Sequence, residues 1–389
     1  MSWQFYLALV TFLVLFAINF RAIQGLRTIK SLKDISLSDE KSGLPKVSIM
    51  LATMNNEETI EDSVNALIQT QYENFEIIVI NDRSTDQTGD ILARLQQQTA
   101  DLKICNIEQL PSGWLGKNHA LHVGSKVATG DYILFIDGQS ILHPTCVSRA
   151  VRYMVENKLD HISTTYGLKN STLWVKTYLS DMTLDGFKTS KPCRAIDSSS
   201  RSFIGNGKFN MVKADKYRDF GGHEAIKMCI IDDQMLGMYM KFKGGRQDML
   251  WGEPMIMVDW YKTTYAFVRG VEKHAFPGMA YSLVATTLVS FMAIVFHVYP
   301  MIAVFLTDGV TQMLNILIVV MRVFVFQYLA IISNGSIRNP MFSLFSPLVG
   351  IWVLWNSAIR FIINKGISWK DTHYSIDELK TCQFPEFKN

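Results

Sequence analysis

The chain has 389 residues, of which 48 % are hydrophobic and 19 % are charged, and its formal net charge is +3 at pH 7. A soluble domain usually carries about a quarter charged residues, so the composition argues against a purely soluble protein. The small net charge, with no interleaving of aromatic and basic residues, argues against a nucleic-acid-binding protein.

The cysteines are five in number and none form a CxxC pair. An odd count without such pairs predicts neither a disulfide framework nor a zinc site. Isolated thiols are typical of a reducing, cytosolic compartment. The five positions are Cys105, Cys146, Cys193, Cys229 and Cys382.

Residues 3–20 form an apolar run without charges, long enough to nearly cross a hydrocarbon layer of about 30 Å. The run lacks the basic start and the small-residue cleavage site of a signal peptide. We therefore predict that residues 1–22 are a retained transmembrane anchor. The basic residues that follow place the next part of the chain in the cytosol by the positive-inside rule; they are Arg21, Arg27, Lys30 and Lys33.

A basic and polar linker (residues 23–45) leads into a domain predicted to span residues 46–262. Near-continuous apolar runs alternate there with helical patterns, which predicts an α/β fold with a parallel sheet covered on both faces. The expected strands are 46–53, 75–81, 102–106 and 132–137, and the expected helices are 57–70, 85–98 and 117–128. Ligands bind at the carboxyl ends of such strands, where Thr53, Asp82 and Asp137 stand.

Three long apolar stretches, 281–306, 313–332 and 341–363, predict a transmembrane region at 281–363, followed by a C-terminal tail at 364–389. Arg322 inside the second stretch is costly in lipid unless it faces protein or water. Three crossings would place the tail outside, whereas Arg360, Lys365 and Lys370 favour a cytosolic tail. We therefore expect two to three C-terminal spans; with two, the third stretch would be re-entrant or interfacial.

The segment VINDRSTDQT places Asp82 where a carboxylate can accept a hydrogen bond from the N3–H of a uracil base. The alternative is a local role, since Ser84 or Asp86 would cap the next helix. Thr53 and Glu57 close the first strand–helix corner and would flank the base and ribose. Glu57 fits equally well as an acidic residue at the positive end of its helix dipole.

The segment GWLGKNHA places Lys117 at the start of a helix, where backbone amides bind anions and a lysine adds a charge for phosphate. A surface lysine is the alternative, and Trp114 and Gly116 beside it make the motif more specific. Asp137 in LFIDGQS can hold a divalent metal that bridges diphosphate oxygens. A second carboxylate is usual two residues later, but Gln139 stands there.

The pair Asp232 and Asp233 in CIIDDQMLG offers a general base, and adjacent carboxylates raise one another's pKa. A helix N-cap followed by a first-turn acid is the alternative. Arg269, Lys273 and His274 lie in FVRGVEKHAFPG, within a predicted interfacial helix at 263–280. They either form its polar face or close over the phosphates of a donor.

Taken in order, ATMNNEE, VINDRSTDQT, GWLGKNHA, LFIDGQS, FGGHE, IIDDQML and RGVEKHAF resemble family 2 glycosyltransferases with the GT-A fold. The GWxGK, GGH and WKDTHY segments are similar to those of membrane-anchored carotenoid glycosyltransferases, of staphyloxanthin and chlorobactene type, and of hopene-associated glycosyltransferases. The resemblance covers residues 46–374, nearly the whole chain.

The resemblance implies inverting transfer of a single sugar from a UDP-sugar, with UDP-glucose expected, and a divalent metal, Mg²⁺ or Mn²⁺. It makes Asp82 the uridine-binding aspartate, Asp137 the first acid of the DxD motif and Lys117 a residue near the diphosphate. Asp233 would be the base, with Asp232 as its neighbour.

Two departures from the family pattern stand out. Gln139 replaces the second acid of DxD, which puts the affinity for metal in doubt. The QxxRW motif of processive synthases is absent, and RGVEKH stands near its place, which assigns Arg269 and Lys273 to the donor and favours transfer of one sugar.

The sequence thus predicts a multi-pass protein of the plasma membrane whose cytosolic domain glycosylates an isoprenoid lipid such as a carotenoid or hopanoid. Diacylglycerol or a polyprenyl phosphate is an alternative acceptor. A different alternative is an inactive relative that serves as a membrane binding subunit.

Overall fold

The computed structural model describes residues 2–37, 43–99, 101–259, 261, 263–332, 340–369 and 372–382. Contacts between residues divide the chain into two compact units. The helical unit comprises residues 1–28, 170–191 and 261–367, and the α/β unit comprises residues 29–169, 192–260 and 368–389. Residues 38–42 of the predicted linker and Lys370 of the basic tail lie outside the described residues.

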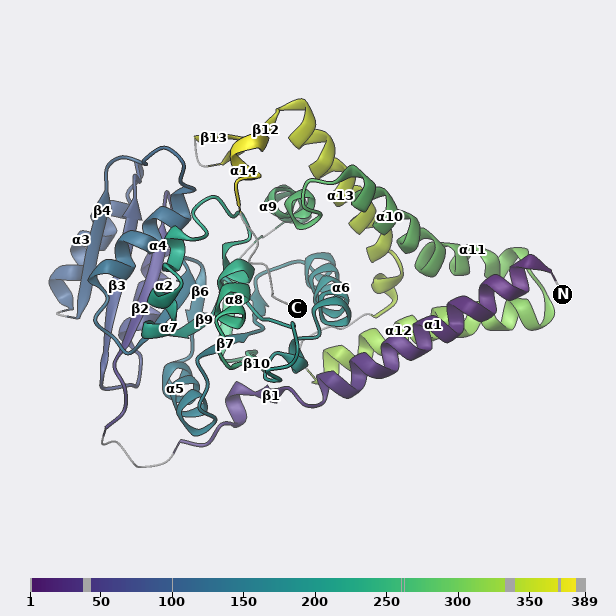
Figure 1. The fold of residues 1–389 in the computed structure, drawn as a ribbon, viewed down its shortest axis with the longest axis horizontal. Helices are drawn as coiled ribbons and strands as arrows, with labels where there is room; N and C mark the ends of the chain where they lie inside the picture. Colours follow the sequence, from purple (N-terminus) through teal and green to yellow (C-terminus); the bar gives the residue numbers. More distant parts are fainter. Residues whose placement is uncertain are drawn as a thin grey trace. The chain divides into compact units, whose positions relative to one another are not determined.

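The α/β unit is built on an eight-stranded sheet with the strand order β1-β10-β7-β9-β5-β2-β3-β4 (Figure 1). All neighbours pair in parallel except β9, which runs antiparallel to both β5 and β7. The strands are β1 (Lys30–Ser31), β2 (Val47–Thr53), β3 (Phe75–Asp82), β4 (Leu102–Ile107), β5 (Tyr132–Asp137), β7 (His161–Thr164), β9 (Asn210–Lys213) and β10 (Gln247–Trp251). The predicted α/β fold is confirmed, and the antiparallel strand β9 is an addition to it.

The helices and short strands of this unit follow the order predicted for alternating strands and helices. The helices are α2 (Ile60–Ile68), α3 (Thr88–Gln98), α4 (Gly116–Val127), α5 (Cys146–Glu156), α7 (Ala214–Asp219), α8 (Asp232–Phe242) and α14 (Ile376–Leu379). A second sheet has the order β6 (Ser140–Leu142), β11 (Ile256–Asp259), β8 (Gly167–Lys169), and β12 (Gly366–Trp369) pairs with β13 (Thr372–Ser375).

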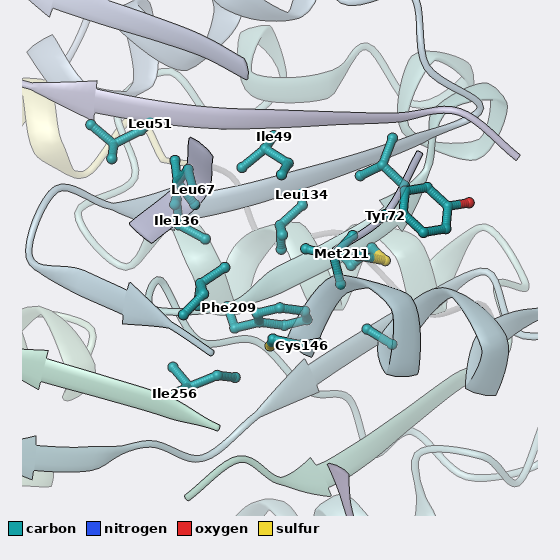
Figure 2. Close-up of a cluster of buried hydrophobic side chains, with 14 of the residues drawn as sticks. Ile49, Leu51, Leu67, Tyr72, Leu134, Ile136, Cys146, Phe209, Met211 and Ile256 are labelled. Atoms are coloured by element: carbon teal, nitrogen blue, oxygen red, sulfur yellow. The ribbon is translucent and has the colours of Figure 1, made fainter. Parts of the chain in front are cut away.

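Side chains from alternate positions of the central strands fill two apolar clusters. Ile49 and Leu51 of β2 lie in one cluster with Leu67 of α2, as Figure 2 shows, while Met50 lies in the other with Leu121 of α4. Successive side chains of a strand point to opposite faces, so the near-continuous apolar run of β2 supplies both clusters. Burial on both faces holds the strand ends in place.

The helical unit consists of long apolar helices. Its elements are α1 (Trp3–Leu26), α6 (Leu173–Ser190), α9 (Thr264–Gly278), α10 (Leu283–Ala293), α11 (Tyr299–Leu306), α12 (Gly309–Ile332) and α13 (Ser346–Ile363). A π-helical turn, Ile294–Val298, joins α10 to α11. Within the described residues, four helices are long and apolar enough to cross a membrane: Trp3–Leu26, Leu283–Leu306, Gly309–Ile332 and Ser346–Ile363. This agrees with the one N-terminal and three C-terminal apolar segments predicted from the sequence.

Arg27 at the end of α1 and Arg322 of α12 have polar partners inside the helical unit. Arg322 of α12 donates to Asp181 of α6 at 2.5 Å and to the Ser343 carbonyl at 3.0 Å. Helix α1 packs along α12 (Figure 1), and Arg27 donates to the Tyr328 hydroxyl at 2.5 Å. A charge in an apolar environment is tolerated when it is paired, which accounts for Arg322 within an apolar stretch.

The expectation of isolated thiols is wrong for two of the cysteines. Cys229 and Cys382 form a disulfide across 153 positions of sequence, whereas Cys105, Cys146 and Cys193 are free. Sequence spacing did not indicate this pair because the fold brings the C-terminal segment back to the loop before α8. The thiols therefore no longer support a cytosolic location. The prediction of a cytosolic location now depends only on the basic residues after α1.

Glu76 of β3 is the acceptor at the centre of a buried polar network within the sheet. It is 4 % exposed and accepts from the Ser48 hydroxyl at 2.6 Å, the Thr129 amide at 2.8 Å and Lys103 at 2.6 Å. Burial opposes its ionisation, but the hydrogen bonds, with that from Lys103 first among them, lower the pKa of Glu76 to about 2. The ionised carboxylate thus connects β2, β3, β4 and the turn before β5.

We predict that Glu76→Ala lowers the free energy of unfolding by about 2–4 kcal/mol, because it leaves buried donors without an acceptor. Chemical denaturation of the purified protein measures this. Glu61→Ala is the matched control, since Glu61 pairs with Arg94 on the surface and such pairs contribute about 0–1 kcal/mol. Equal effects of the two substitutions would contradict a structural role for the network.

Candidate active site

The predicted ligand-binding edge of the sheet is where the polar residues gather. Thr53, Asp82 and Asp137 are the last residues of β2, β3 and β5. The strands are neighbours in register, with Thr53 opposite Asn81 and Ala52 opposite Asp137. Parallel strands that end together therefore bring these three side chains to one edge.

Asp137 lies between two lysines. Its Oδ1 is 3.0 Å from the Nζ of Lys117, and its Oδ2 is 2.6 Å from the Nζ of Lys208. Burial alone would raise the pKa of Asp137, but the ammonium groups of Lys117 and Lys208 hold it below its ordinary value. Lys208 is 6 % exposed and was not among the residues predicted for the site.

Asp232 and Asp233 open helix α8 beside these lysines. The Nζ of Lys117 is 2.9 Å from Oδ2 of Asp232, while Oδ2 of Asp233 accepts from the Gly207 amide at 2.7 Å. Burial raises the pKa of Asp232 to about 6, with Lys117 opposing the rise and Asp233 adding to it. The two carboxylates therefore differ, because one pairs with an ammonium group and the other with a backbone amide.

The loop before α8 is attached to α4, which sets the distance between Lys117 and Asp232. The side-chain amide of Asn118 donates to the carbonyls of Ile226 at 2.8 Å and Cys229 at 3.0 Å. Asn118 is 1 % exposed. Sequence reasoning included it in GWLGKNHA without a role, and its burial shows that it positions the loop.

Two glycines let the segment that carries Lys208 meet the start of α8. A Cβ on Gly205 would lie 2.1 Å from the Asp233 carbonyl oxygen, and one on Gly237 would lie 1.5 Å from that of Ile204. Contacts this short exclude any side chain at either position. The backbone of residues 204–207 therefore runs directly against α8.

The side chains just described enclose a small cavity. Its polar lining includes Lys117, Asp137, Asp232 and Asp233, with Phe135 and His223 among the other lining residues. Burial lowers the pKa of His223 to about 3, so this histidine is neutral near pH 7 and adds no charge. The cavity thus combines three carboxylates with the ammonium group of Lys117, and Lys208 reaches Asp137 from outside this lining.

Asp82 occupies a separate corner of the same edge. Its carboxylate is 2.8 Å from Nε of Arg83 and is 4 % exposed. A Cβ on Gly116 would lie 2.7 Å from Oδ2 of Asp82, so the glycine of the GWLGK motif lets the start of α4 reach this corner. The Gly116 amide donates to the Tyr374 hydroxyl at 3.3 Å. Sequence reasoning missed both Arg83 and Tyr374.

Thr53 and Glu57 differ in their surroundings. The Thr53 hydroxyl is buried and has no hydrogen-bond partner within the described part of the chain, as expected of a group that awaits a ligand. Glu57 instead accepts from the Gln87 amide at 3.0 Å, just before α3. Asp86 accepts from the Thr88 amide at 3.0 Å, although the N-cap residue of α3 is Gln87 and neither Ser84 nor Asp86 holds that position.

The remaining predicted residues do not join the cavity lining. Gln139 lies in the turn between Asp137 and β6, and its backbone carbonyl accepts from the Asp259 amide at 3.2 Å. Arg269 and Lys273 lie on α9 in the helical unit, where Arg269 is 3.5 Å from Glu272. Their assignment to the donor stays a prediction.

The side chains present do not fit the predicted metal site. No group of three His, Cys, Asp or Glu side chains suited to a metal occurs in the residues that the structure describes. Both oxygens of Asp137 face lysine ammonium groups, and position 139 supplies an amide. A divalent cation at Asp137 would have to displace a lysine and would find no second carboxylate two residues later.

Part of this chain is similar to known glycosyltransferases. Residues 48–221 match the family model described as Glycosyl transferase family 2. Over 119 residues the chain is 34 % identical to an uncharacterized glycosyltransferase of Haemophilus influenzae and 33 % identical to a poly-beta-1,6-N-acetyl-D-glucosamine synthase of Staphylococcus aureus. Each match covers 31 % of this chain, but only 35 % and 26 % of the respective relatives.

Among solved structures, the chain is similar to a mannosyltransferase of Pyrobaculum calidifontis in complex with GDP-Man and Mn²⁺. The TM-score is 0.54 at 15 % sequence identity, and the match covers 91 % of this chain and 99 % of the other. At this identity the likeness concerns the fold. Together the comparisons support the GT-A fold for this chain, and residues 48–221 are the part that matches the family 2 glycosyltransferase model.

Proposed function

We propose that the chain is an inverting glycosyltransferase that moves one sugar, with glucose expected, from a UDP-sugar to an isoprenoid lipid of the membrane. The observation that carries the proposal is that Lys117 pairs with Asp137 at the carboxyl end of β5 and with Asp232, which is adjacent to Asp233 at the start of α8. It supplies a base and a cation side by side in a family 2 domain. The long apolar helices of the same chain support a lipid acceptor.

In this proposal Asp82 and the unsatisfied Thr53 hydroxyl bind the nucleoside, and Lys117 contacts the diphosphate. Asp233 accepts the proton of the acceptor hydroxyl, whose oxygen then bonds to the anomeric carbon as the bond to the diphosphate breaks. Asp233 suits the base better than Asp232 does, since the Lys117 ammonium is 2.9 Å from Asp232. Asp232 would instead position Lys117.

The acceptor and donor are identified by mass spectrometry of lipids from cells that express the chain or its Asp233→Asn variant. We expect a hexosylated isoprenoid lipid only with the unchanged chain, because the amide cannot accept the proton; loss of a base commonly costs about 10²–10⁴-fold in rate. UDP binding should persist in Asp233→Asn.

Asp215→Asn, at an exposed position of the same unit, is the matched control and should leave the product level unchanged. A glycosylated diacylglycerol or polyprenyl phosphate would replace the proposed acceptor. Absence of any new glycolipid, together with absence of UDP binding, would favour an inactive binding subunit. An unchanged product level in Asp233→Asn would remove Asp233 from the role of base.

The titration of Asp232 predicts a pH-dependent cost to folding. Because burial raises its pKa to about 6, the folded state binds a proton that the unfolded state has already lost between about pH 4 and 6. The stability contributed by that proton is present at low pH and is lost as the pH rises through 6.

Asp232→Asn should therefore gain stability relative to the unchanged chain as the pH rises from 4 to 7, by about 2 kcal/mol or a few degrees in the unfolding midpoint. Thermal unfolding in detergent at several pH values measures the difference. The exposed-site variant Asp215→Asn should show a constant difference. If the difference in unfolding midpoint were constant with pH for Asp232→Asn as well, the pKa of Asp232 would not be raised in the folded state.

The C-terminal segment supports an even number of C-terminal crossings. Residues 368–382 belong to the α/β unit, through Tyr374 with Gly116 and through the Cys229–Cys382 disulfide. A chain that leaves this unit and returns to it must cross the membrane an even number of times. Helix α13, with 18 residues, is the shortest and least apolar of the C-terminal candidates and packs against α9.

We propose that α1, Leu283–Leu306 and α12 span the plasma membrane, that α13 lies at its surface, and that the α/β unit faces the cytosol. A fluorescent protein that folds only in the cytosol should be active when fused after the C-terminus. Alkaline phosphatase, which needs export, should be active when fused after Asp308. Active phosphatase at the C-terminus would show instead that α13 crosses.

A further inference from the structure

Lys208 is a buried lysine at the predicted metal position, and neither motif nor spacing singled it out. Its side chain is 7 % exposed, and its ammonium group lies 2.6 Å from Asp137. Its backbone amide donates to the Asn206 side chain at 3.0 Å, which fixes the turn that presents it. Lysine is seldom buried without a partner, so the fold has placed this charge at the end of β5.

The position next to Lys208 brings the main chain up to the same charges. A Cβ on Gly207 would lie 3.2 Å from both Oδ2 of Asp137 and Nζ of Lys117. The Gly207 amide also donates to Asp233. The turn that carries Lys208 therefore lies against Asp137, Lys117 and Asp233.

We infer that Lys117 and Lys208 together hold the diphosphate of the donor and stabilise the departing charge, and that Asp137 is their counter-ion and not a metal ligand. The inference rests on the proposed function, since it takes a nucleoside diphosphate sugar as the donor. Two ammonium groups carry the same charge of +2 as one divalent cation, and lysine binds phosphate as a point charge.

The carboxylates of the cavity are already engaged in a way that favours lysine over metal. Each oxygen of Asp137 has its own ammonium group, Asp232 pairs with Lys117, and Asp233 accepts from a backbone amide. A metal ion would have to lie beside two like charges. A phosphate group, being negative, can instead bind to the Lys117 and Lys208 ammonium groups by sharing them with Asp137.

The transfer step balances without a metal. The bond between the anomeric carbon and the phosphate oxygen breaks, and its electron pair stays on that oxygen, where the lysine ammonium groups lie. The acceptor oxygen forms the new bond to the anomeric carbon, and its proton goes to Asp233. Nothing is oxidised or reduced in this step.

The test compares the dissociation constants of UDP and uridine for the full-length chain in detergent, by isothermal titration calorimetry with EDTA and then with Mn²⁺. The ratio of the two constants isolates the diphosphate. We expect the unchanged chain to prefer UDP over uridine by the same factor in both buffers. Lys208→Met should weaken UDP roughly 10- to 100-fold and leave uridine unchanged.

Lys208→Arg should restore most of the UDP affinity, and Lys213→Met is the matched control. Lys213 lies on β9 in the same stretch of chain and pairs with Asp215 at the surface, so both affinities should stay unchanged. An unaltered unfolding midpoint of Lys208→Met would show that the loss belongs to the diphosphate and not to the fold.

Three results would overturn the inference. A preference for UDP that disappears in EDTA and returns with Mn²⁺ would assign the diphosphate to a metal, while the proposed function stands. Equal loss of UDP and uridine in Lys208→Met would make Lys208 a structural residue only. Absence of binding of either ligand to the unchanged chain would remove the donor, and with it both the proposed function and this inference.

Discussion

The ion pairs of Lys117 determine how the site is assembled. Its ammonium lies 3.0 Å from Asp137 and 2.9 Å from Asp232. Burial acts to lower the pKa of Lys117, but the carboxylates of Asp137 and Asp232 outweigh burial and raise it, so the charge persists. A charge in this setting is stable only beside its counter-charges. The end of β5, the start of α4 and the start of α8 must therefore meet.

The rest of the α/β unit holds the end of β5 and the starts of α4 and α8 in position. Strand β5 is fixed on both faces, because Leu134 and Ile136 lie in one apolar cluster (Figure 2) and Ile133 and Phe135 lie in the other. Asn118 fixes the loop before α8 onto α4. Glycines at 205 and 237 allow backbone contacts that no side chain would permit. The cluster contains three carboxylates and two lysines, so a diphosphate can enter only where the lysines compensate its charge.

The helical unit depends on apolar composition and not on a cluster of charges. Its helices are apolar over most of their length, and the few charges inside it, such as Arg322 and Asp181, pair with each other. Local composition is enough to identify such helices, because spanning a hydrocarbon layer demands about 20 apolar residues in a row. Composition does not determine how many of these helices cross the membrane. The return of the C-terminal segment to the α/β unit is the observation that favours an even number of C-terminal crossings.

The sequence by itself determined the alternation of strands and helices, the apolar helices, and the polar residues Thr53, Asp82 and Asp137 at strand ends. These features depend on periodicity and on neighbours along the chain. Tertiary structure decided that Lys208 meets Asp137 across 71 positions and that Cys229 meets Cys382 across 153. It also inserted β9 antiparallel beside β5. Local sequence patterns do not predict such pairings, because the pairings depend on the path of the intervening chain. For that reason a predicted metal ligand, Asp137, became the partner of two lysines.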